Sequence, residues 1–298
     1  MSGGGGGGSE RKGGVVVTGV SSGIGAATVH ELVSAGFTVF GTIRRGKDAA
    51  RVQAAGATPI IMDVTYQSSI TRAYETITRM LGNRPLRGLV NNAGTPGIGP
   101  IELLDLEELR QTFAVNVFGV IGVTQVFLPL LRAFRGRIIN ISSVSARLAL
   151  PFAGSYAASK FALEGLSDSL RRELAGTGVA VVVIQPGSIR TAIWEKIAAF
   201  DIRSARGTIY QVPLERIRSM ALRSGERGLP PEMVARAVRR ALTSRKPPTR
   251  ILVVSGSKWR RKLLTLLPDG WLDRMIRRRL TPKEDRGGKG ESESRAAT

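Results

Sequence analysis

Short apolar runs alternate with longer amphipathic stretches along the first 255 residues of the chain. Between the runs, apolar residues recur at the spacing of helix faces. The alternation predicts an α/β protein with a doubly wound, parallel, seven-stranded sheet between two layers of helices. The runs read as buried parallel strands, and they are Val15–Val17, Thr38–Ile43, Ile60–Met62, Leu89–Asn91, Arg137–Ser143, Gly178–Gln185 and Arg250–Val254.

The two ends of the 298-residue chain differ from this repeating part. Residues 1–12 include six consecutive glycines and predict a disordered leader. Residues 13–257 form the predicted single domain, in which residues 192–230 are expected to be a variable lid over a substrate. Residues 258–298 form a basic amphipathic tail, expected to be disordered from about residue 283.

A glycine-rich loop, Thr18–Gly25, follows the first apolar run and precedes a helical pattern. Gly19 allows a tight turn, while Gly23 and Gly25 remove side chains where a pyrophosphate and the next helix approach the backbone. The amides at the start of that helix favour an anion. Because it stands between a strand and a helix, the loop predicts a dinucleotide site.

Tyr156 and Lys160 are four residues apart in a helix-forming run, so both side chains project from one helix face. A free tyrosine has a pKa near ~10, and a neighbouring cation lowers it towards the range of a base at neutral pH. The pair is therefore a candidate acid and base. The alternative is an ordinary pair of residues on a helix.

Taken together, these motifs resemble the short-chain dehydrogenase/reductase family in its single-domain form, over roughly residues 13 to 255. Ser143, thirteen residues before Tyr156, completes the resemblance. The runs Phe161–Gly165 and Val39–Arg44 look most like the hydroxysteroid and retinol dehydrogenase branch. The resemblance implies a Rossmann-type fold in three α/β/α layers and an oxidoreductase that acts on CH–OH groups.

By this resemblance, four residues carry the chemistry. Tyr156 is the acid/base, and Lys160 lowers its pKa and binds the nicotinamide ribose. Ser143 stabilises the developing oxyanion, and Asn116 bends its helix and supports a proton relay. Simpler roles remain open, because serines at strand ends are often turn formers and an asparagine can be inert inside a helix.

The resemblance also implies a set of residues around the cofactor. Asp63 would face the adenine, although it could instead cap the following helix. Asn91 is expected to be mainly structural. The full expected set is Gly19, Ser21, Ser22, Gly23, Ile24, Gly25, Arg44, Asp63, Val64, Asn92, Ala93, Gly94, Tyr156, Lys160, Pro186, Gly187, Ile189 and Thr191.

Arg44 and Arg45 stand at the end of the second strand, where an acidic residue would select NAD. A guanidinium suits a phosphate, so NADP(H) is the expected cofactor and NAD(H) the less favoured one. The competing explanation is compositional, because 35 arginines stand against 9 lysines in the whole chain.

Composition narrows the function further. The chain has no cysteine and one histidine, so disulfides, thiolate metal sites and histidine clusters are excluded, and no metal is expected. No uninterrupted apolar run reaches the roughly 18 residues that span a bilayer. The net charge of +21 divides into +7 for residues 1–200 and +14 for the remainder. Codon bias towards arginine is one explanation of this charge, and specific nucleic-acid binding is not expected.

The expected substrate is a hydrophobic alcohol or carbonyl compound, such as a steroid, retinoid or lipid, because the lid carries apolar residues. The rival hypothesis is a non-catalytic cofactor-binding scaffold or sensor that acts through its basic surface. Proteins that resemble this one often pair through their long helices, so a homodimer or homotetramer is expected. The expected location is the cytoplasm.

The tail carries two stripes of apolar residues at helical spacing among many arginines and lysines. This composition is typical of a helix in a membrane interface, so peripheral contact with an anionic membrane is one expectation. Packing on the enzyme, over the pocket or in an oligomer, is the other. The stripe residues are Trp259, Leu263, Leu266 and Leu267, then Trp271, Leu272, Met275 and Ile276.

Overall fold

A computed structural model describes residues 12–199, 203–256 and 267–280. Its centre is a parallel sheet of seven strands in the order β3-β2-β1-β4-β5-β6-β7, as expected. The order reverses between β1 and β4, which is where doubly wound sheets bind their ligands. The strands are β1 Gly14–Val17, β2 Thr38–Ile43, β3 Thr58–Ile61, β4 Leu86–Asn91, β5 Arg137–Ile141, β6 Ala180–Pro186 and β7 Arg250–Val253.

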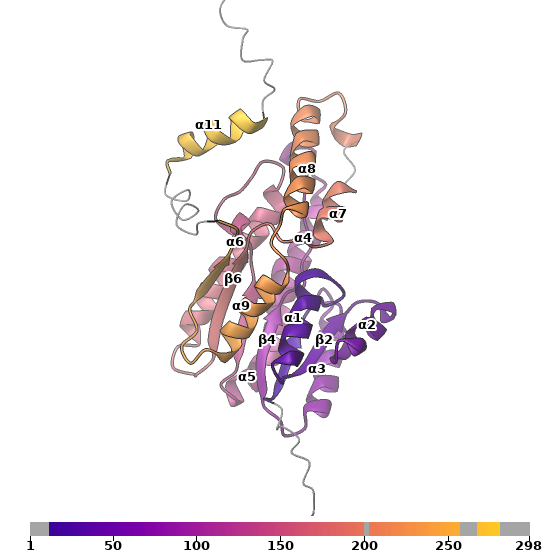
Figure 1. Ribbon diagram of the computed structural model, residues 1–298, viewed down its shortest axis with the longest axis vertical. Helices are drawn as coiled ribbons and strands as arrows, with labels where there is room; N and C mark the ends of the chain where they lie inside the picture. The colour runs from indigo at the N-terminus through magenta and orange to yellow at the C-terminus, as the bar shows by residue number, and fades with distance from the viewer. Residues whose placement is uncertain (1–11, 200–202, 257–266, 281–298) are drawn as a thin grey trace, which may run out of the picture.

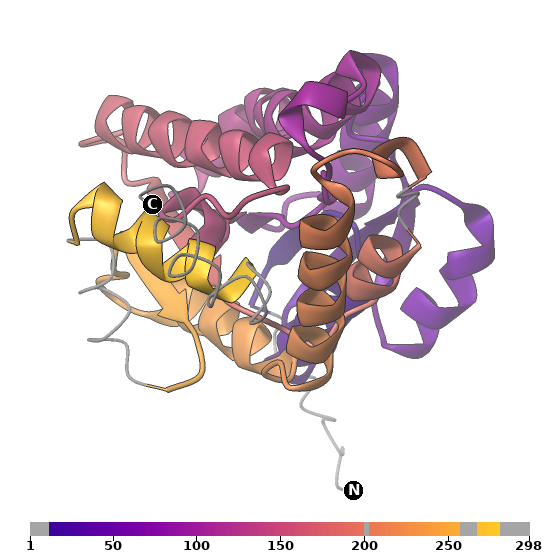
Figure 2. The same cartoon turned by 90° about the horizontal axis from the view of Figure 1, so that it is seen from above.

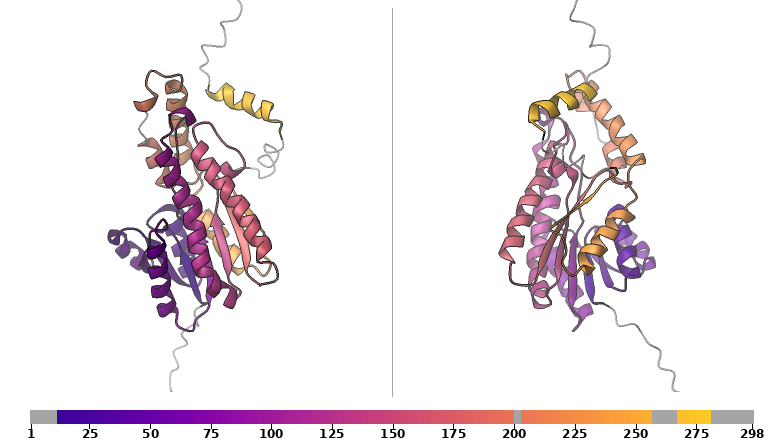
Figure 3. Two further views of the ribbon diagram at one scale, coloured as in Figure 1. Left: turned by 180° about the vertical axis from the view of Figure 1, so that it is seen from behind. Right: turned by 60° about the vertical axis from the view of Figure 1, so that its left-hand side comes forward.

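Helices cover both faces of the sheet (Figure 1, Figure 3). One face carries α1 (Gly23–Ser34), α2 (Ala49–Ala54) and α9 (Glu232–Thr243). The opposite face carries α3 (Gln67–Leu81), α5 (Gly119–Ala133) and α6 (Gly154–Glu173). This arrangement confirms the three-layer fold predicted from the alternating pattern.

Two apolar clusters, one on each side of the sheet, form the core. Val15 and Val17 of β1 pack towards α1 and α9, while Val16 packs towards the other helical layer. All three valines are fully buried. Successive residues of a strand point to opposite faces, so a strand covered on both faces is apolar throughout, as the run of valines indicated.

Residues Leu103–Leu131 carry a continuous helical pattern in the sequence, and the structure divides this segment. After a short 3-10 turn, Ile101–Leu103, helix α4 (Leu106–Phe113) begins behind Asp105, whose carboxylate accepts the Glu107 amide at 2.8 Å. A π-helical turn, Ala114–Phe118, then joins α4 to α5.

Leu106–Ala133 is the stretch among the described residues whose length and composition would allow it to cross a membrane, with a mean hydropathy of 1.9. The sequence pattern missed it because Asn116 and Thr124 interrupt the apolar run. In the structure it lies along the sheet, with 44% of the apolar window buried. Burial against a sheet accounts for such a composition in a core helix.

Beyond the carboxyl ends of the strands lie the lid helices α7 (Ile193–Ala198) and α8 (Gln211–Glu226) and the terminal helix α11 (Asp269–Leu280) (Figure 2). Helix α11 contacts α8. Its Leu272, Met275 and Ile276 are partly buried, whereas Trp271 is 70% exposed. Residues 1–11 of the predicted leader lie outside the described residues, as do Trp259, Leu263 and Leu266 of the tail and the end expected to be disordered from about residue 283. Lys12, the last residue of the predicted leader, is ordered, and its amide donates to the Gly36 carbonyl oxygen at 3.1 Å.

Candidate active site

The glycine-rich loop has the geometry that its composition predicted. Gly19 and Gly23 adopt φ angles of 69° and 58°, in the left-handed region that glycine tolerates best. A Cβ on Gly25 would lie 2.3 Å from the Gly19 carbonyl oxygen. The loop therefore opens the start of α1 to an anion without side chains in the way, and it fits the pyrophosphate of a dinucleotide.

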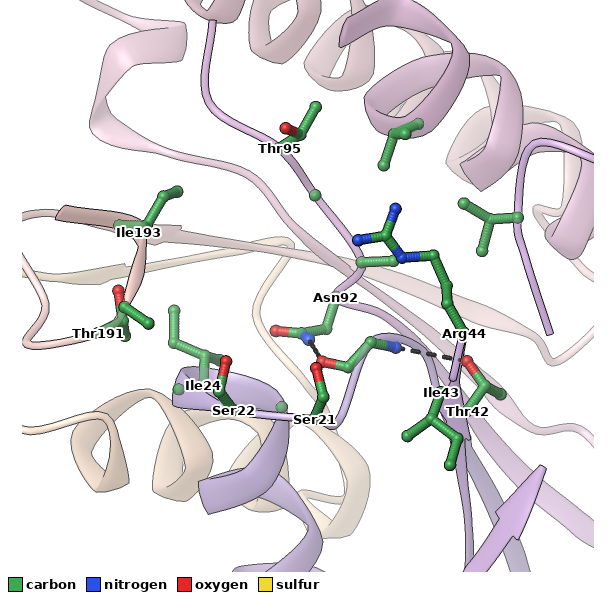
Figure 4. Close-up of a pocket in the computed structure, with 18 of the residues that line it drawn as sticks. Ser21, Ser22, Ile24, Thr42, Ile43, Arg44, Asn92, Thr95, Thr191 and Ile193 are labelled. Carbon is green, nitrogen blue, oxygen red and sulfur yellow. Dashed lines mark hydrogen bonds between the residues drawn. The ribbon is translucent and has the colours of Figure 1, made fainter. Parts of the chain in front are cut away.

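A cavity of about 330 Å³, here named the dinucleotide cavity, extends from this loop along the ends of β2, β3 and β4 (Figure 4). Arg44 extends into it from the end of β2. Thirteen of the residues expected around the cofactor line this cavity: Gly19, Ser21, Ser22, Gly23, Ile24, Gly25, Arg44, Asp63, Val64, Asn92, Ala93, Gly94 and Thr191.

Asn92 fastens the glycine loop to β4. Its side-chain amide donates to the carbonyl oxygens of Thr18 at 2.8 Å and Gly19 at 2.9 Å. Asn91 does not contact the glycine loop through its side-chain amide. It is buried, and this amide donates to Thr124 on α5 and to Asn140 on β5. The structural role expected for Asn91 agrees with these contacts.

Asp63 lines the dinucleotide cavity while its carboxylate closes a local turn. One oxygen accepts the amide of Thr65 at 2.9 Å and the hydroxyl of Thr65 at 2.7 Å. Tyr66, and not Asp63, occupies the N-cap position of α3. The capping alternative is therefore wrong for that helix, and Asp63 caps the turn before it.

A second cavity, of about 360 Å³, lies between the ends of β5 and β6 and the lid, and is here named the substrate cavity. Its wall is largely apolar, with Leu150 and Phe152 from the loop after β5 and Trp194 and Met220 from the lid. Ile24, Asn92, Gly94, Thr191 and Ile193 line both cavities. The two cavities are therefore neighbours with a common boundary.

Ser143, Tyr156 and Lys160 all line the substrate cavity, together with Pro186, Gly187 and Ile189 of the loop after β6. The Lys160 ammonium donates to the Ile141 carbonyl oxygen at 2.9 Å and lies 5.8 Å from the centre of the Tyr156 ring. The Ser143 hydroxyl accepts the Ser145 amide at 3.0 Å, so this serine also has the turn-forming role of the alternative.

Burial sets the electrostatics of this group. It raises the pKa of the Tyr156 phenol, and an interaction with the Ser143 side chain opposes that rise. Burial also lowers the pKa of Lys160 to about 8, against the attraction of the Glu164 carboxylate. The pKa of Tyr156 is raised, whereas the sequence predicted that it is lowered. Loss of water around the phenol is the largest influence on this pKa. A basic Tyr156 therefore needs positive charge close to it.

Asn116 lies in the π-helical turn and is fully buried. Its side chain accepts the Thr95 amide at 2.9 Å and donates to the Thr95 carbonyl oxygen and to Ser159, both at 3.0 Å. Asn116 lines neither cavity. It connects the loop after β4 to α6, the helix that carries Tyr156 and Lys160.

Sequence reasoning missed a polar network beneath the site. Glu164, one turn after Lys160, is buried and accepts from Gln185 on β6 at 2.8 Å and from Arg250 on β7 at 2.9 Å. Arg250 also pairs with Asp168 at 2.9 Å. These bonds join α6 to the sheet below the candidate catalytic residues. The available signal in the sequence was the position of Glu164, four residues after Lys160 and therefore on the same helix face.

Comparison with known proteins agrees with the geometry. The family model described as short chain dehydrogenase matches residues 14–201. The chain belongs to the short-chain dehydrogenase family. It is therefore a member of an oxidoreductase family whose fold binds a nicotinamide cofactor.

Relatives of this short-chain dehydrogenase differ in cofactor and substrate. The NADPH-dependent 3-dehydrocapnine reductase of Ornithobacterium rhinotracheale is 36% identical over 269 residues, which cover 88% of this chain and 95% of that protein. Retinol dehydrogenase 16 of Mus musculus is 40% identical, over 60% of this chain and 57% of that one. A structure from Burkholderia phymatum in complex with NAD has a TM-score of 0.74 and 25% identity, over 89% and 95% of the two chains.

Proposed function

We propose that the protein is an NADP(H)-dependent oxidoreductase that interconverts an alcohol and its ketone or aldehyde on a hydrophobic small molecule. The observation that carries the proposal is the common boundary of the two cavities. A cofactor on the glycine loop and a substrate beside Tyr156 would meet at that boundary. Contact between the two reactants is the first requirement of a transfer reaction.

Each candidate residue has a role in this reaction. For reduction, Tyr156 donates its phenolic proton to the carbonyl oxygen, and the Ser143 hydroxyl donates a hydrogen bond to the same oxygen as negative charge develops there. For oxidation the phenolate removes the alcohol proton. The Lys160 ammonium supplies the positive charge that a basic Tyr156 needs. When bound, the nicotinamide supplies or accepts the hydride, so that the alcohol and NADP⁺ give the carbonyl compound, NADPH and a proton.

Arg44 supports the choice of NADP(H). It extends into the dinucleotide cavity from the end of β2, where the 2′-phosphate of the adenosine would lie, and no shielding carboxylate pairs with it among the described residues. The relative from Ornithobacterium is named for NADPH, whereas the Burkholderia structure holds NAD. NAD(H) is therefore the second candidate cofactor.

The wall of the substrate cavity supports a hydrophobic substrate. Ile217, Met220 and Ala221 of α8 face it, and Lys160 is the charged side chain in its lining. Apolar walls bind apolar molecules by removing both surfaces from water. The name of the retinol dehydrogenase relative is consistent with a lipid-like alcohol. We include steroid-, retinoid- and lipid-like alcohols in the proposed substrate class.

Assembly and location belong to the same proposal. Phe118 on the α4–α5 segment and Phe161 and Leu166 on α6 are exposed by 66%, 47% and 40%. Exposed apolar side chains on two neighbouring helices support pairing through these helices in a homodimer or homotetramer. Trp271 on the exposed side of α11 supports peripheral contact with an anionic membrane from the cytoplasm.

The test is a panel of hydrophobic alcohols and ketones assayed with NADP(H) and with NAD(H), with the Tyr156→Phe variant as the matched control. Wild type should turn over members of the panel, faster with NADP(H). The variant lacks the transferable proton and should lose about 10³-fold or more in turnover while its NADP⁺ dissociation constant stays the same. Comparable turnover by both proteins would refute the role of Tyr156.

The rival is a non-catalytic scaffold. It predicts that NADP(H) binds but no member of the panel is turned over. The convergence of Ser143, Tyr156 and Lys160 on one apolar cavity argues against it, because a scaffold gains nothing from a buried lysine beside a phenol in the same cavity.

A further inference from the structure

The first lid helix, α7, forms a wall of both cavities. Ala192 before it and Lys196 within it, four residues apart, line the dinucleotide cavity. Trp194 and Ile197, three residues apart, line the substrate cavity. Residues at these spacings share a helix face. One face of the helix therefore meets the cofactor side and the other meets the substrate side, with Ile193 lining both.

Close contacts fasten α7 in this position. The Trp194 indole N–H donates to the Ile189 carbonyl oxygen, in the loop after β6, at 2.6 Å. The same indole lies directly against Gly225 of α8, where an added Cβ would be 2.6 Å from the ring. Thr191, just before α7, approaches the glycine loop so closely that a Cβ on Gly23 would lie 3.0 Å from its methyl group. Helix α7 is thus connected to the glycine loop, the loop after β6 and α8.

Lys196 is a cation of this wall that no sequence motif indicated. It lines the dinucleotide cavity and is exposed to solvent. No carboxylate of residues 12–199, 203–256 or 267–280 forms an ion pair with it. Arg44, the other cation in the lining, enters from the end of β2, at the adenosine end. The two cations therefore approach the cavity from different elements. Lys196 lies on α7, which follows Thr191, and Thr191 lies against the glycine loop.

We propose that Lys196 is a cofactor-binding residue whose ammonium contacts the pyrophosphate of the dinucleotide and so fixes α7 as the wall of the substrate cavity. This inference rests on the proposed function, since it needs a dinucleotide on the glycine loop. The pyrophosphate is common to NAD and NADP, whereas the 2′-phosphate opposite Arg44 is present only in NADP. Lys196 would thus contribute equally to the binding of both nucleotides.

Calorimetric dissociation constants of NADP⁺ and NAD⁺ test the assignment in four proteins: wild type, Lys196→Ala, Lys196→Arg and Arg223→Ala. Arg223 is an exposed lid arginine that lines neither cavity, so its variant loses the same charge elsewhere. Lys196→Ala should weaken both nucleotides about 10-fold, the loss expected for one charge-assisted contact. Lys196→Arg should restore most of the affinity, and Arg223→Ala should match wild type.

Amide hydrogen exchange gives a second readout, on α7 itself. NADP⁺ should protect the amides of residues 193–199 in wild type and should protect them less in Lys196→Ala at equal saturation. An unchanged dissociation constant for Lys196→Ala, or a loss equal to that of Arg223→Ala, would overturn the assignment. Weakening of NADP⁺ alone would place the ammonium at the 2′-phosphate and also overturn it. If wild type binds neither nucleotide, the proposed function itself fails and this assignment fails with it.

Discussion

The two adjoining cavities are built from different kinds of sequence. Half of the residues that line the dinucleotide cavity are glycines or carry short polar side chains, and most of these lie at the ends of β1 to β4. The substrate cavity is made mostly of large apolar side chains from the loop after β5 and from the lid. A nucleotide has a constant shape and is bound by a constant backbone conformation, so short sequence motifs specify its site. An apolar ligand needs shape and surface, which many residues at irregular spacing can supply.

The two cavities also differ in the charged side chains that line them. The dinucleotide cavity has cations at its rim, on Arg44 and Lys196. The substrate cavity has one buried lysine, whose pKa burial lowers to about 8. One cavity is therefore suited to an anion in water and the other to a neutral molecule away from water.

After Tyr156, the largest effect in the substrate cavity is expected at Ser143. Ser143→Ala should lower kcat by about 10²-fold or more, because a hydrogen-bond donor to the developing oxyanion is lost. Ser142→Ala is the matched control, since Ser142 lines the same cavity and its hydroxyl has no hydrogen-bond partner in the described part of the chain. Steady-state kinetics with one hydrophobic ketone measures both. A larger loss for Ser142→Ala would make that neighbour the functional serine.

Lys160 should make stability depend on alkaline pH. Its folded-state pKa of about 8 is below the ordinary 10.5, so folding disfavours the charged form. That cost is present below pH 8 and is relieved as the pH rises from about 8 to 10.5. Across this window the free energy of unfolding of wild type should rise by about 3 kcal/mol relative to Lys160→Met. Urea titrations at several pH values measure it, and parallel pH curves for the two proteins would contradict the burial of this charge.

Arg44 tests the specificity of the dinucleotide cavity. Arg44→Asp should weaken NADP⁺ about 10-fold or more and improve NAD⁺, because a carboxylate repels the 2′-phosphate and accepts from the ribose hydroxyls. Dissociation constants for both nucleotides measure the exchange. Tighter binding of NAD⁺ than of NADP⁺ by wild type would show that the arginine does not select the phosphate.

The smallest effect on turnover is expected from the tail, which lines neither cavity in its described part. Full-length protein should sediment with anionic vesicles at low salt and leave them at high salt, since each basic residue near the surface contributes about 1 kcal/mol. A chain that ends at Ser257 should turn over a dissolved substrate normally and not sediment. Equal sedimentation of both proteins would leave packing against α8 as the role of α11.

The sequence predicted the order of the strands and many of the residues that line the dinucleotide cavity, because strand ends and glycines impose local rules. Thr38–Ile43 was predicted to the residue as β2, and Gly19 and Gly23 have the positive φ angles that their loop position indicated. Strand boundaries were less accurate, since β4 begins at Leu86 and not at Leu89, and Met62 follows β3. Ser142 and Ser143, expected in the fifth strand, follow β5.

The lid could not be predicted to the same extent. The lid was expected to carry apolar residues, but Met220 of α8 and Lys196 of α7 were not connected with either cavity. Their positions depend on contacts between segments far apart in sequence, such as Trp194 with Gly225. The Glu164–Arg250 pair was missed for the same reason, since its partners are 86 residues apart.

The most direct test of the account is the transfer of deuterium from NADPH deuterated at both C4 positions to a hydrophobic ketone that wild type reduces. The alcohol product should carry a single deuterium on its carbinol carbon, and Tyr156→Phe should form almost none of this product under the same conditions. Mass spectrometry of the extracted alcohol reads both results. Alcohol formed without deuterium, or equal labelled product from Tyr156→Phe, would contradict transfer between the two cavities with Tyr156 as the proton donor.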